Sequence, residues 1–195
     1  MMISESFTNK KYCVADCFDD HSKCDFYTQK ILNAYEGGLL NREEDDPNVN
    51  SKGSIYGFMD DLLEIKLPHI EKLVKKSLFP TYSYARIYSK GSFMTPHTDR
   101  PACEYSATVT LDYKSDEPYP IYFNNESILL EKNQMAIYKG SEVVHWRDFW
   151  DCAEDDWVVQ VFLHYVDQDG PFASERNDIK RKEEAEKLFG KKFLT

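Results

Sequence analysis

The spacing of hydrophobic residues changes character at Pro80. Before this point, Tyr12 to Cys17 reads as a short strand, and apolar residues around Phe26 and Ile31 then recur at helical spacing up to Gly37-Gly38. The same spacing predicts a second helix over 58–66 and a third that opens at Pro68. We therefore expect a largely helical N-terminal part.

Beyond Pro80 the hydrophobic pattern alternates with a period of two, as it does in Tyr82, Tyr84, Arg86 and Tyr88. Further short apolar runs, separated by turn-forming residues, cover 106–113, 119–123, 128–131, 135–138, 143–147 and 157–166. About eight short strands at regular spacing are typical of a β-sandwich or barrel. The predicted fold class is mainly β with flanking helices (α+β).

The length of 195 residues fits a single domain. We expect a helical part over 1–80, a β core over 81–167 and a charged C-terminal helix within 171–195, centred on 175–188. The acidic, turn-rich segment 41–53 is interpreted as a solvated loop, with a substrate-facing segment as the alternative.

The composition excludes some classes of function. The chain carries 34 acidic and 24 basic residues, a net charge of −10, which argues against nucleic-acid partners and a polybasic membrane anchor. No apolar run approaches the roughly 18 residues of a membrane-spanning helix, and no signal-peptide pattern is visible, so we expect a cytoplasmic protein.

The five cysteines are an odd number, which favours reduced thiols. Cys13, Cys17, His21 and Cys24 lie close together in sequence, but their spacing is unusual for zinc. Buried thiols are therefore the preferred interpretation of this cluster.

The candidate chemistry rests on His97, Asp99 and His145. Residues i and i+2 of an extended segment share a face, so His97 and Asp99 can bind adjacent positions of one metal. A histidine from a later strand would complete the two-histidine, one-carboxylate set of non-haem Fe(II) oxygenases. The His-x-Asp pair alone has low specificity, and a surface histidine beside a turn aspartate is the competing explanation.

The order of motifs resembles a known family. The segment Tyr88-Ser-Lys-Gly-Ser-Phe-Met-Thr-Pro-His97-Thr-Asp99 resembles the entry to the core of prolyl 4-hydroxylase-like 2-oxoglutarate/Fe(II)-dependent dioxygenases. Residues 135–140, His145 and 157–167 look like the later core strands, and the opening strand and helix around Cys24-Asp25 also match. The resemblance covers about residues 12–167.

This resemblance implies a double-stranded β-helix core, a jelly-roll of the cupin type. It also implies Fe(II), 2-oxoglutarate and O2, with ascorbate as an accessory reductant, and His97, Asp99 and His145 as metal ligands. The implied reaction hydroxylates a C–H bond of a protein side chain, such as proline, or of a free amino acid. Because Asp99 can fill the ligand position that halogenating relatives leave free, hydroxylation is favoured over halogenation.

One position departs from the family pattern. Members place a Lys or Arg on the last core strand to pair with the distal carboxylate of 2-oxoglutarate, but here the corresponding position is Val158. Arg147, two residues after His145 and thus on the same strand face, is our main candidate for this role, with an ion pair to Asp148 or Asp151 as the alternative.

Two more residues complete the expected co-substrate site. Arg86 shares the inward parity of Tyr88, and Tyr88 is expected to contact the co-substrate. His164, on the last strand, is interpreted as a hydrogen-bonded core residue rather than a ligand.

The main alternative function is a metal- or ligand-binding β-barrel without turnover, which the missing late-strand base would favour. A zinc hydrolase is disfavoured because no His-Glu-x-x-His motif occurs. Substrate selection is assigned to 39–57 and 90–96, while the substrate itself and the oligomeric state are left open.

Overall fold

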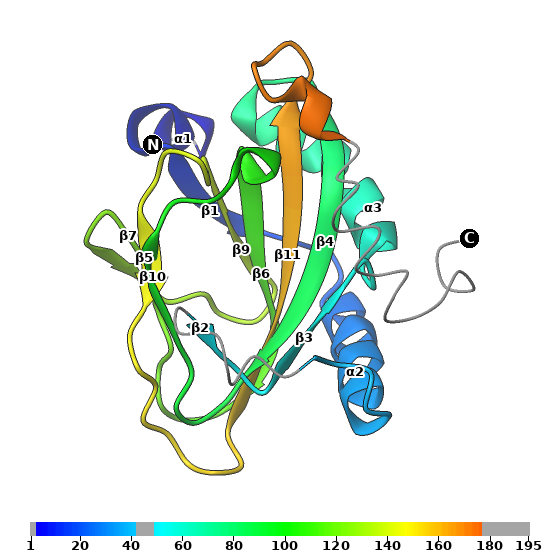
Figure 1. Ribbon diagram of the computed structural model, residues 1–195, viewed down its shortest axis with the longest axis vertical. Coiled ribbons are helices and arrows are strands. Elements are labelled where there is room, and N and C mark those ends of the chain that lie inside the picture. Colours follow the sequence, from blue (N-terminus) through cyan, green and yellow to red (C-terminus); the bar gives the residue numbers. More distant parts are fainter. Residues whose placement is uncertain (1–2, 42–48, 177–195) are drawn as a thin grey trace.

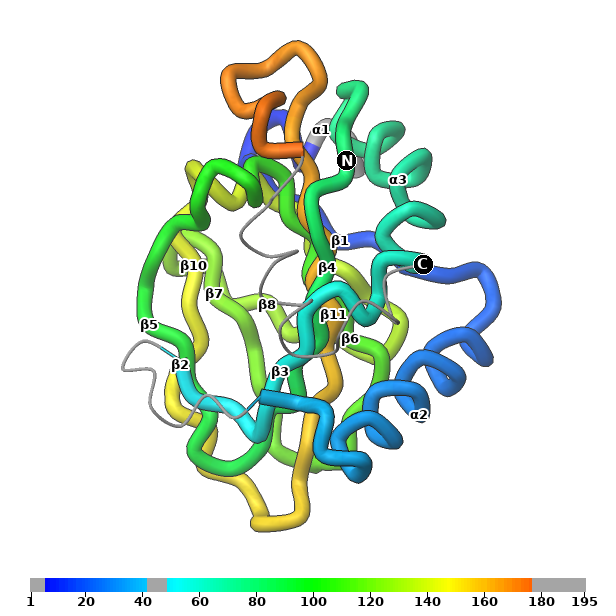
Figure 2. The backbone as a smooth tube through the Cα atoms, turned by 45° about the vertical axis from the view of Figure 1, so that its right-hand side comes forward, coloured from blue at the N-terminus to red at the C-terminus, as the bar shows by residue number. Residues whose placement is uncertain are grey.

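The computed structural model describes residues 3–41 and 49–176. In that part of the chain two antiparallel sheets face each other, and the helices lie outside the larger sheet (Figure 1; Figure 2). The helical elements are α1 (Ile3–Lys10), α2 (Ser22–Glu36), α3 (Asp60–Val74) and the 3-10 turns η1 (Pro101–Cys103) and η2 (Ala173–Arg176). The strands are β1 (Tyr12–Asp16), β2 (Val49–Asn50), β3 (Gly53–Tyr56), β4 (Leu78–Tyr88), β5 (Phe93–His97), β6 (Tyr105–Lys114), β7 (Ile121–Phe123), β8 (Glu126–Ile128), β9 (Gln134–Tyr138), β10 (His145–Arg147) and β11 (Trp157–Asp167).

The chain crosses repeatedly from one sheet to the other. The larger sheet runs β1-β9-β6-β11-β4-β3, and the smaller runs β2-β5-β10-β7-β8. The central strand β11 pairs with β4 on one side and with β6 on the other, both antiparallel. This crossing pattern is that of a jelly-roll, as the sequence predicts.

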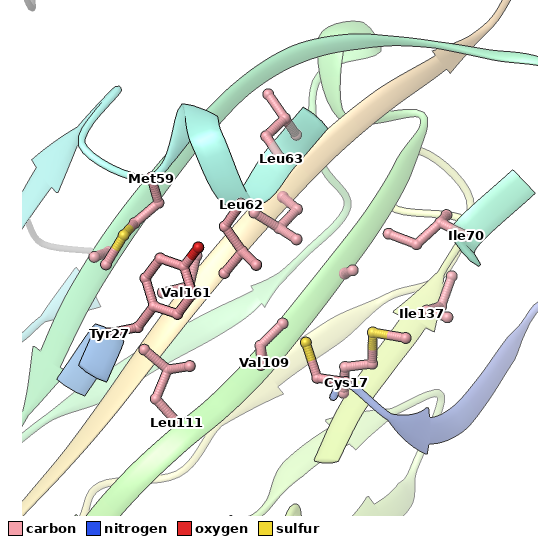
Figure 3. Close-up of a cluster of buried hydrophobic side chains, with 14 of the residues drawn as sticks. Cys17, Tyr27, Met59, Leu62, Leu63, Ile70, Val109, Leu111, Ile137 and Val161 are labelled. Carbon is pink, nitrogen blue, oxygen red and sulfur yellow. The ribbon is translucent and has the colours of Figure 1, made fainter. Parts of the chain in front are cut away.

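Side-chain alternation along β11 gives the larger sheet two different faces. Val159, Val161 and Leu163 pack with the helices in the main hydrophobic core. Figure 3 shows Met59 and Leu62 gathered with Val161 in this core. Burying each aliphatic side chain of this kind stabilises the folded state by roughly 1.5–3 kcal/mol.

The other face of the larger sheet points toward the smaller sheet. On β11 the residues that point to this inner face are Val158, Gln160, Phe162 and His164. Their partners on β4 are Tyr88, Arg86, Tyr84 and Tyr82, respectively. The inner face is therefore polar and aromatic, and it is the face that the site uses.

The prediction of two helices around Pro68 is wrong. A single helix, α3, runs through this residue from Asp60 to Val74. Proline removes one backbone donor but does not force a break when the apolar face on both sides is buried, as Leu62, Leu63 and Ile70 are here. Tertiary packing has overridden the local preference.

Other elements lie outside the sequence prediction. The structure adds α1, β2 and β3, and β4 begins at Leu78, so Pro80 lies inside this strand near a shift in its register with β11. Most of the acidic segment, residues 42–48, and the predicted C-terminal helix beyond Arg176 lie outside the described residues.

All five cysteines are buried and free, as the composition predicts. Burial raises the pKa of the Cys13 and Cys17 thiols to about 12. Among the described residues, the side-chain groups able to hold a metal do not include Cys13, Cys17, His21 or Cys24. No described helix combines the length and apolar character needed to cross a membrane.

Candidate metal centre

Three predicted ligands converge between the two sheets. His97 ends β5, Asp99 follows two residues later, and His145 begins β10, the neighbour of β5, directly opposite His97. Their ligand atoms lie within 4.8 Å of one another. The Nε2 atoms of His97 and His145 lie 3.6 and 3.5 Å from Asp99 Oδ1, respectively.

Backbone carbonyls orient both imidazoles. His97 Nδ1 lies 2.8 Å from the carbonyl oxygen of Thr95, and His145 Nδ1 lies 2.9 Å from that of Val143. A ring whose Nδ1–H donates to a carbonyl keeps its proton there and leaves the Nε2 lone pair free. Both lone pairs then face the same carboxylate oxygen, which is the arrangement that a divalent metal requires.

The second oxygen of Asp99 has its own partner. The Ser106 hydroxyl donates to Asp99 Oδ2 at 2.9 Å, and the same hydroxyl lies 2.9 Å from Nδ1 of the buried His164. The backbone N–H of Asp99 donates to the carbonyl of Gly140 at 2.8 Å. Oδ2 is therefore held from behind while Oδ1 faces the histidines. His164 is a hydrogen-bonded core residue, as predicted.

Electrostatics favour an ionised carboxylate. Burial by itself would raise the pKa of Asp99, but its interactions with the His145 and His97 side chains hold that pKa well below the ordinary range. The interaction with Asp99 likewise raises the pKa of His97. Two imidazole nitrogens and a carboxylate oxygen form a donor set that suits Fe(II) and related divalent metals.

Gly140 allows the loop to approach this carboxylate. A Cβ at this position would lie 2.3 Å from Asp99 Oδ2 and 2.4 Å from the Cys103 carbonyl oxygen. Neither Ser106 nor Gly140 is singled out by the sequence. The signal for Ser106 is the alternation along 106–113, which places it on the inward face with Thr108 and Thr110.

Arg147 is buried inside the barrel, as its spacing from His145 predicts. It is 2% exposed, and its guanidinium donates to the Tyr119 carbonyl oxygen at 2.6 Å and to Gln160 Oε1 at 2.9 Å. Gln160 in turn donates to Thr110 Oγ1 at 2.8 Å. These partners replace the alternative ion pair with Asp148 or Asp151, and they link β10 to β11 and β6.

Three buried donors cluster around Arg147 without an acceptor. Within the described residues, Arg147 Nε, the Tyr119 hydroxyl and Trp150 Nε1 have no hydrogen-bond partner. The guanidinium carbon lies 4.8 Å from the Tyr119 ring centroid, and the Tyr119 ring stacks on Trp150 at 4.7 Å. Buried donors are rarely left unpaired, so each of these three groups is a candidate to meet a bound acceptor. Tyr119 and Trp150 carry no recognisable motif and are missed by the sequence.

The two remaining predicted residues lie beside this cluster. Tyr88 is fully buried, and its hydroxyl accepts a hydrogen bond from Arg86 at 3.2 Å. The guanidinium carbons of Arg86 and Arg147 lie 5.6 and 5.2 Å from the Tyr88 ring centroid, respectively. The structure thus brings together all six residues that the sequence singled out as site residues.

No protein-family model and no curated protein sequence matches this chain. Solved structures do match it in fold. A prolyl hydroxylase from Trichoplax adhaerens, in complex with a hypoxia inducible factor peptide fragment, is 14% identical with a TM-score of 0.63, covering 90% of each chain. HygX from Streptomyces hygroscopicus, with nickel and 2-oxoglutarate bound, is 10% identical with a TM-score of 0.63, covering 86% of this chain and 87% of HygX.

A third match performs a different reaction. SnoK, a non-haem α-ketoglutarate-dependent carbocyclase from nogalamycin biosynthesis, is 8% identical with a TM-score of 0.67, covering 84% of this chain and 83% of SnoK. The fold prediction is therefore confirmed: the chain has the double-stranded β-helix fold shared by the 2-oxoglutarate- and iron-dependent oxygenases.

Proposed function

We propose that this protein is an Fe(II)- and 2-oxoglutarate-dependent dioxygenase that hydroxylates a C–H bond. The observation that carries the proposal is the convergence of His97, Asp99 and His145 at one point inside this fold. When bound there, iron with 2-oxoglutarate would supply the chemistry that couples O2 reduction to oxidation of an organic substrate.

The protein's own contribution begins with holding the metal. Carbonyl-anchored imidazoles and a carboxylate held through Oδ2 present three ligand atoms within 4.8 Å of one another. Three protein ligands on one face of an octahedral metal leave three positions for co-substrate and O2. Because Asp99 can fill the carboxylate ligand position, hydroxylation is favoured over halogenation.

Arg147 is our candidate for the distal carboxylate of 2-oxoglutarate. It lies on the strand that carries His145, and its partner Gln160 is on β11, the strand where the family pattern has its base. An Nε–H without an acceptor in a buried site would gain a charge-assisted hydrogen bond from a carboxylate. Tyr88, whose ring contacts the guanidinium, would line the same site.

The proposed substrate is a peptide side chain or a free amino acid. The peptide complex of the Trichoplax prolyl hydroxylase supports the first, because it shows that this fold can accommodate a polypeptide. SnoK supports small molecules, because a carbocyclase of natural-product biosynthesis shares the fold. Both remain candidates at this step.

The test measures succinate formation and metal binding together. Wild-type protein with Fe(II), ascorbate and 2-oxoglutarate is expected to release succinate, including slow release without substrate, while His97→Ala should abolish both succinate and tight metal binding. His21→Ala, which alters an exposed histidine, is the matched control. Arg147→Gln should raise KM for 2-oxoglutarate at least tenfold, against an unchanged value for Arg176→Gln.

Two outcomes would contradict the proposal. If metal and 2-oxoglutarate bind but no succinate forms with peptides or amino acids, the protein is a non-catalytic binding barrel. If His97→Ala binds metal as tightly as wild type, the metal centre is wrongly assigned.

A further inference from the structure

A pocket of about 370 Å³ opens beside the metal centre. It is lined by residues from β2, β4 and β5, namely Val49, Tyr84, Arg86, Met94, Thr95, Pro96 and His97. The pocket includes His97, whose side chain is 37% exposed, so a molecule bound there would lie against a proposed metal ligand. This position is suited to a substrate.

The lining of this pocket combines apolar walls with polar groups and one fixed charge. Val49, Met94, Pro96 and the Tyr84 ring supply apolar walls, and Arg86 is the one lining residue that is always charged. A matching molecule has an apolar body and an anionic group.

Arg86 is held in place before any ligand binds. It is only 5% exposed, and its guanidinium carbon lies 5.2 Å from the Tyr84 ring centroid and 5.7 Å from that of Phe162. The hydrogen bond to the Tyr88 hydroxyl fixes a further donor. A planar guanidinium held against aromatic side chains loses little freedom on binding a carboxylate and is well suited to a bidentate contact.

The two arginines can serve different carboxylates. When one carboxylate of 2-oxoglutarate chelates a metal, a single carboxylate remains, and the unpaired Nε–H of Arg147 lies with the donors of Tyr119 and Trp150. Both guanidinium groups contact the Tyr88 ring, but Arg86 lines the open pocket and Arg147 is not among its lining residues. A carboxylate that Arg86 binds in this pocket would therefore come from a second molecule.

We infer that the pocket beside His97 binds the substrate, that Arg86 recognises a free carboxylate on it, and that the substrate is a small carboxylic acid such as a free amino acid. This inference rests on the proposed function for the meaning of "substrate", but the binding itself does not depend on turnover. It selects between the two substrate classes above, because an internal residue of a peptide has no free carboxylate on its backbone.

The test compares an acid with its amide. Calorimetric titration uses 3-phenylpropionate and 3-phenylpropionamide, which share an apolar body, with protein loaded with Zn(II) and 2-oxoglutarate. The acid is expected to bind at least tenfold more tightly than the amide. Arg86→Gln should remove this preference, Arg86→Lys should retain part of it, and the Kd for 2-oxoglutarate should change less than threefold in both.

A second variant guards against misfolding of the Arg86 variants. Thr95→Trp fills the pocket without altering either arginine or the backbone carbonyl that holds His97, and should abolish binding of the acid while 2-oxoglutarate still binds. Circular dichroism confirms the fold of each variant.

Several results would overturn the inference. These are equal binding of acid and amide, absence of saturable acid binding, or equal loss of 2-oxoglutarate and acid binding in Arg86→Gln, which would assign Arg86 to the co-substrate. The titration and the succinate assay of the Fe(II)-loaded protein together separate the two proposals: an acid preference in the titration, with no succinate from the Fe(II)-loaded protein, contradicts the enzyme but keeps the anion site.

Discussion

Asp99 is positioned by contacts that are independent of any metal. Ser106 holds Oδ2, the Gly140 carbonyl accepts from the backbone N–H, and His164 stands behind Ser106. Loss of a group that orients a metal ligand typically lowers metal affinity by roughly 10–100-fold. Single atoms outside the ligand set are therefore expected to control metal binding.

Ser106→Ala tests this positioning. Loss of the hydroxyl should release Oδ2 and lower the metal affinity roughly 10–100-fold, measured by competition with a chelating dye. The matched control is Thr108→Ala on the same strand, whose hydroxyl lies 3.4 Å from that of Tyr138 and does not contact Asp99. Equal metal affinity in the two variants would show that Ser106 plays no positioning role.

Gly140→Ala tests the close approach of the loop. The new Cβ would lie 2.3 Å from Asp99 Oδ2 and 2.8 Å from Ser106 Oγ, so the carboxylate must move. Overpacking of this kind costs typically about 1–3 kcal/mol of unfolding free energy. We expect lower stability in urea together with weakened metal binding, and little effect of Ser141→Ala next to it. Unchanged metal affinity in Gly140→Ala would mean that Asp99 is not confined by the loop.

At the level of elements, the cation that we propose for the co-substrate lies on β10 of the smaller sheet rather than on β11 of the larger sheet. The family pattern places a base on the last core strand, and here Val158 stands there while Arg147 projects inward from β10. Gln160 on β11 accepts a hydrogen bond from the guanidinium, so the two strands still share the cluster. Alternation could indicate where Arg147 points because parity depends only on local backbone geometry.

Other residues of the site could not be predicted from the sequence, and the reason is physical. Tyr119 and Trp150 come from loops beside β7 and after β10, and nothing local indicates that a loop residue will be buried. Ser106 and His164 meet across paired strands, which requires the register as well as the parity. The His97, Asp99 and His145 set was accessible because spacing and strand order together imply it.

Pro68→Ala tests why α3 is continuous. Proline in a helix interior is about 3 kcal/mol less favourable than alanine, although it also restricts the unfolded chain. Because α3 already runs through this position, we expect the substitution to stabilise the protein by about 1–2 kcal/mol in urea unfolding. A loss of stability would show instead that Pro68 shapes a bend on which packing of α3 depends.

At the scale of the whole molecule, the two faces of the larger sheet have different roles: the outer face packs in the main core, and the inner face lines the candidate site. Helices cover the outer face of the larger sheet and enclose the main core, which includes Cys13 and Cys17 (Figure 1). The inner face is left for polar and aromatic groups around the candidate site. Stability should accordingly respond to groups buried in the core, far from the ligands.

Because of the buried thiols, the stability of the folded protein should depend on pH. Cys13 and Cys17 have a pKa of about 12 in the folded protein because burial disfavours the thiolate, whereas the ordinary value is near 9. Below pH 9 both states are protonated and the thiols contribute nothing to the dependence. Between about pH 9 and 12 the unfolded chain loses protons that the folded state keeps, so stability falls as pH rises.

The contribution of the thiols to this loss of stability can be measured by comparing wild type with a variant that lacks them. From pH 8 to pH 10 each thiol should lower the unfolding free energy by about 1.4 kcal/mol. Tyrosines also titrate in this range, so the measurement compares wild type with the Cys13→Ala/Cys17→Ala variant, by urea unfolding in the presence of reductant. The variant is less stable at pH 8 because it leaves cavities, but its further loss on going to pH 10 should be smaller by about 3 kcal/mol. Equal losses in the two proteins would mean that these thiols ionise as readily in the folded core as in the unfolded chain.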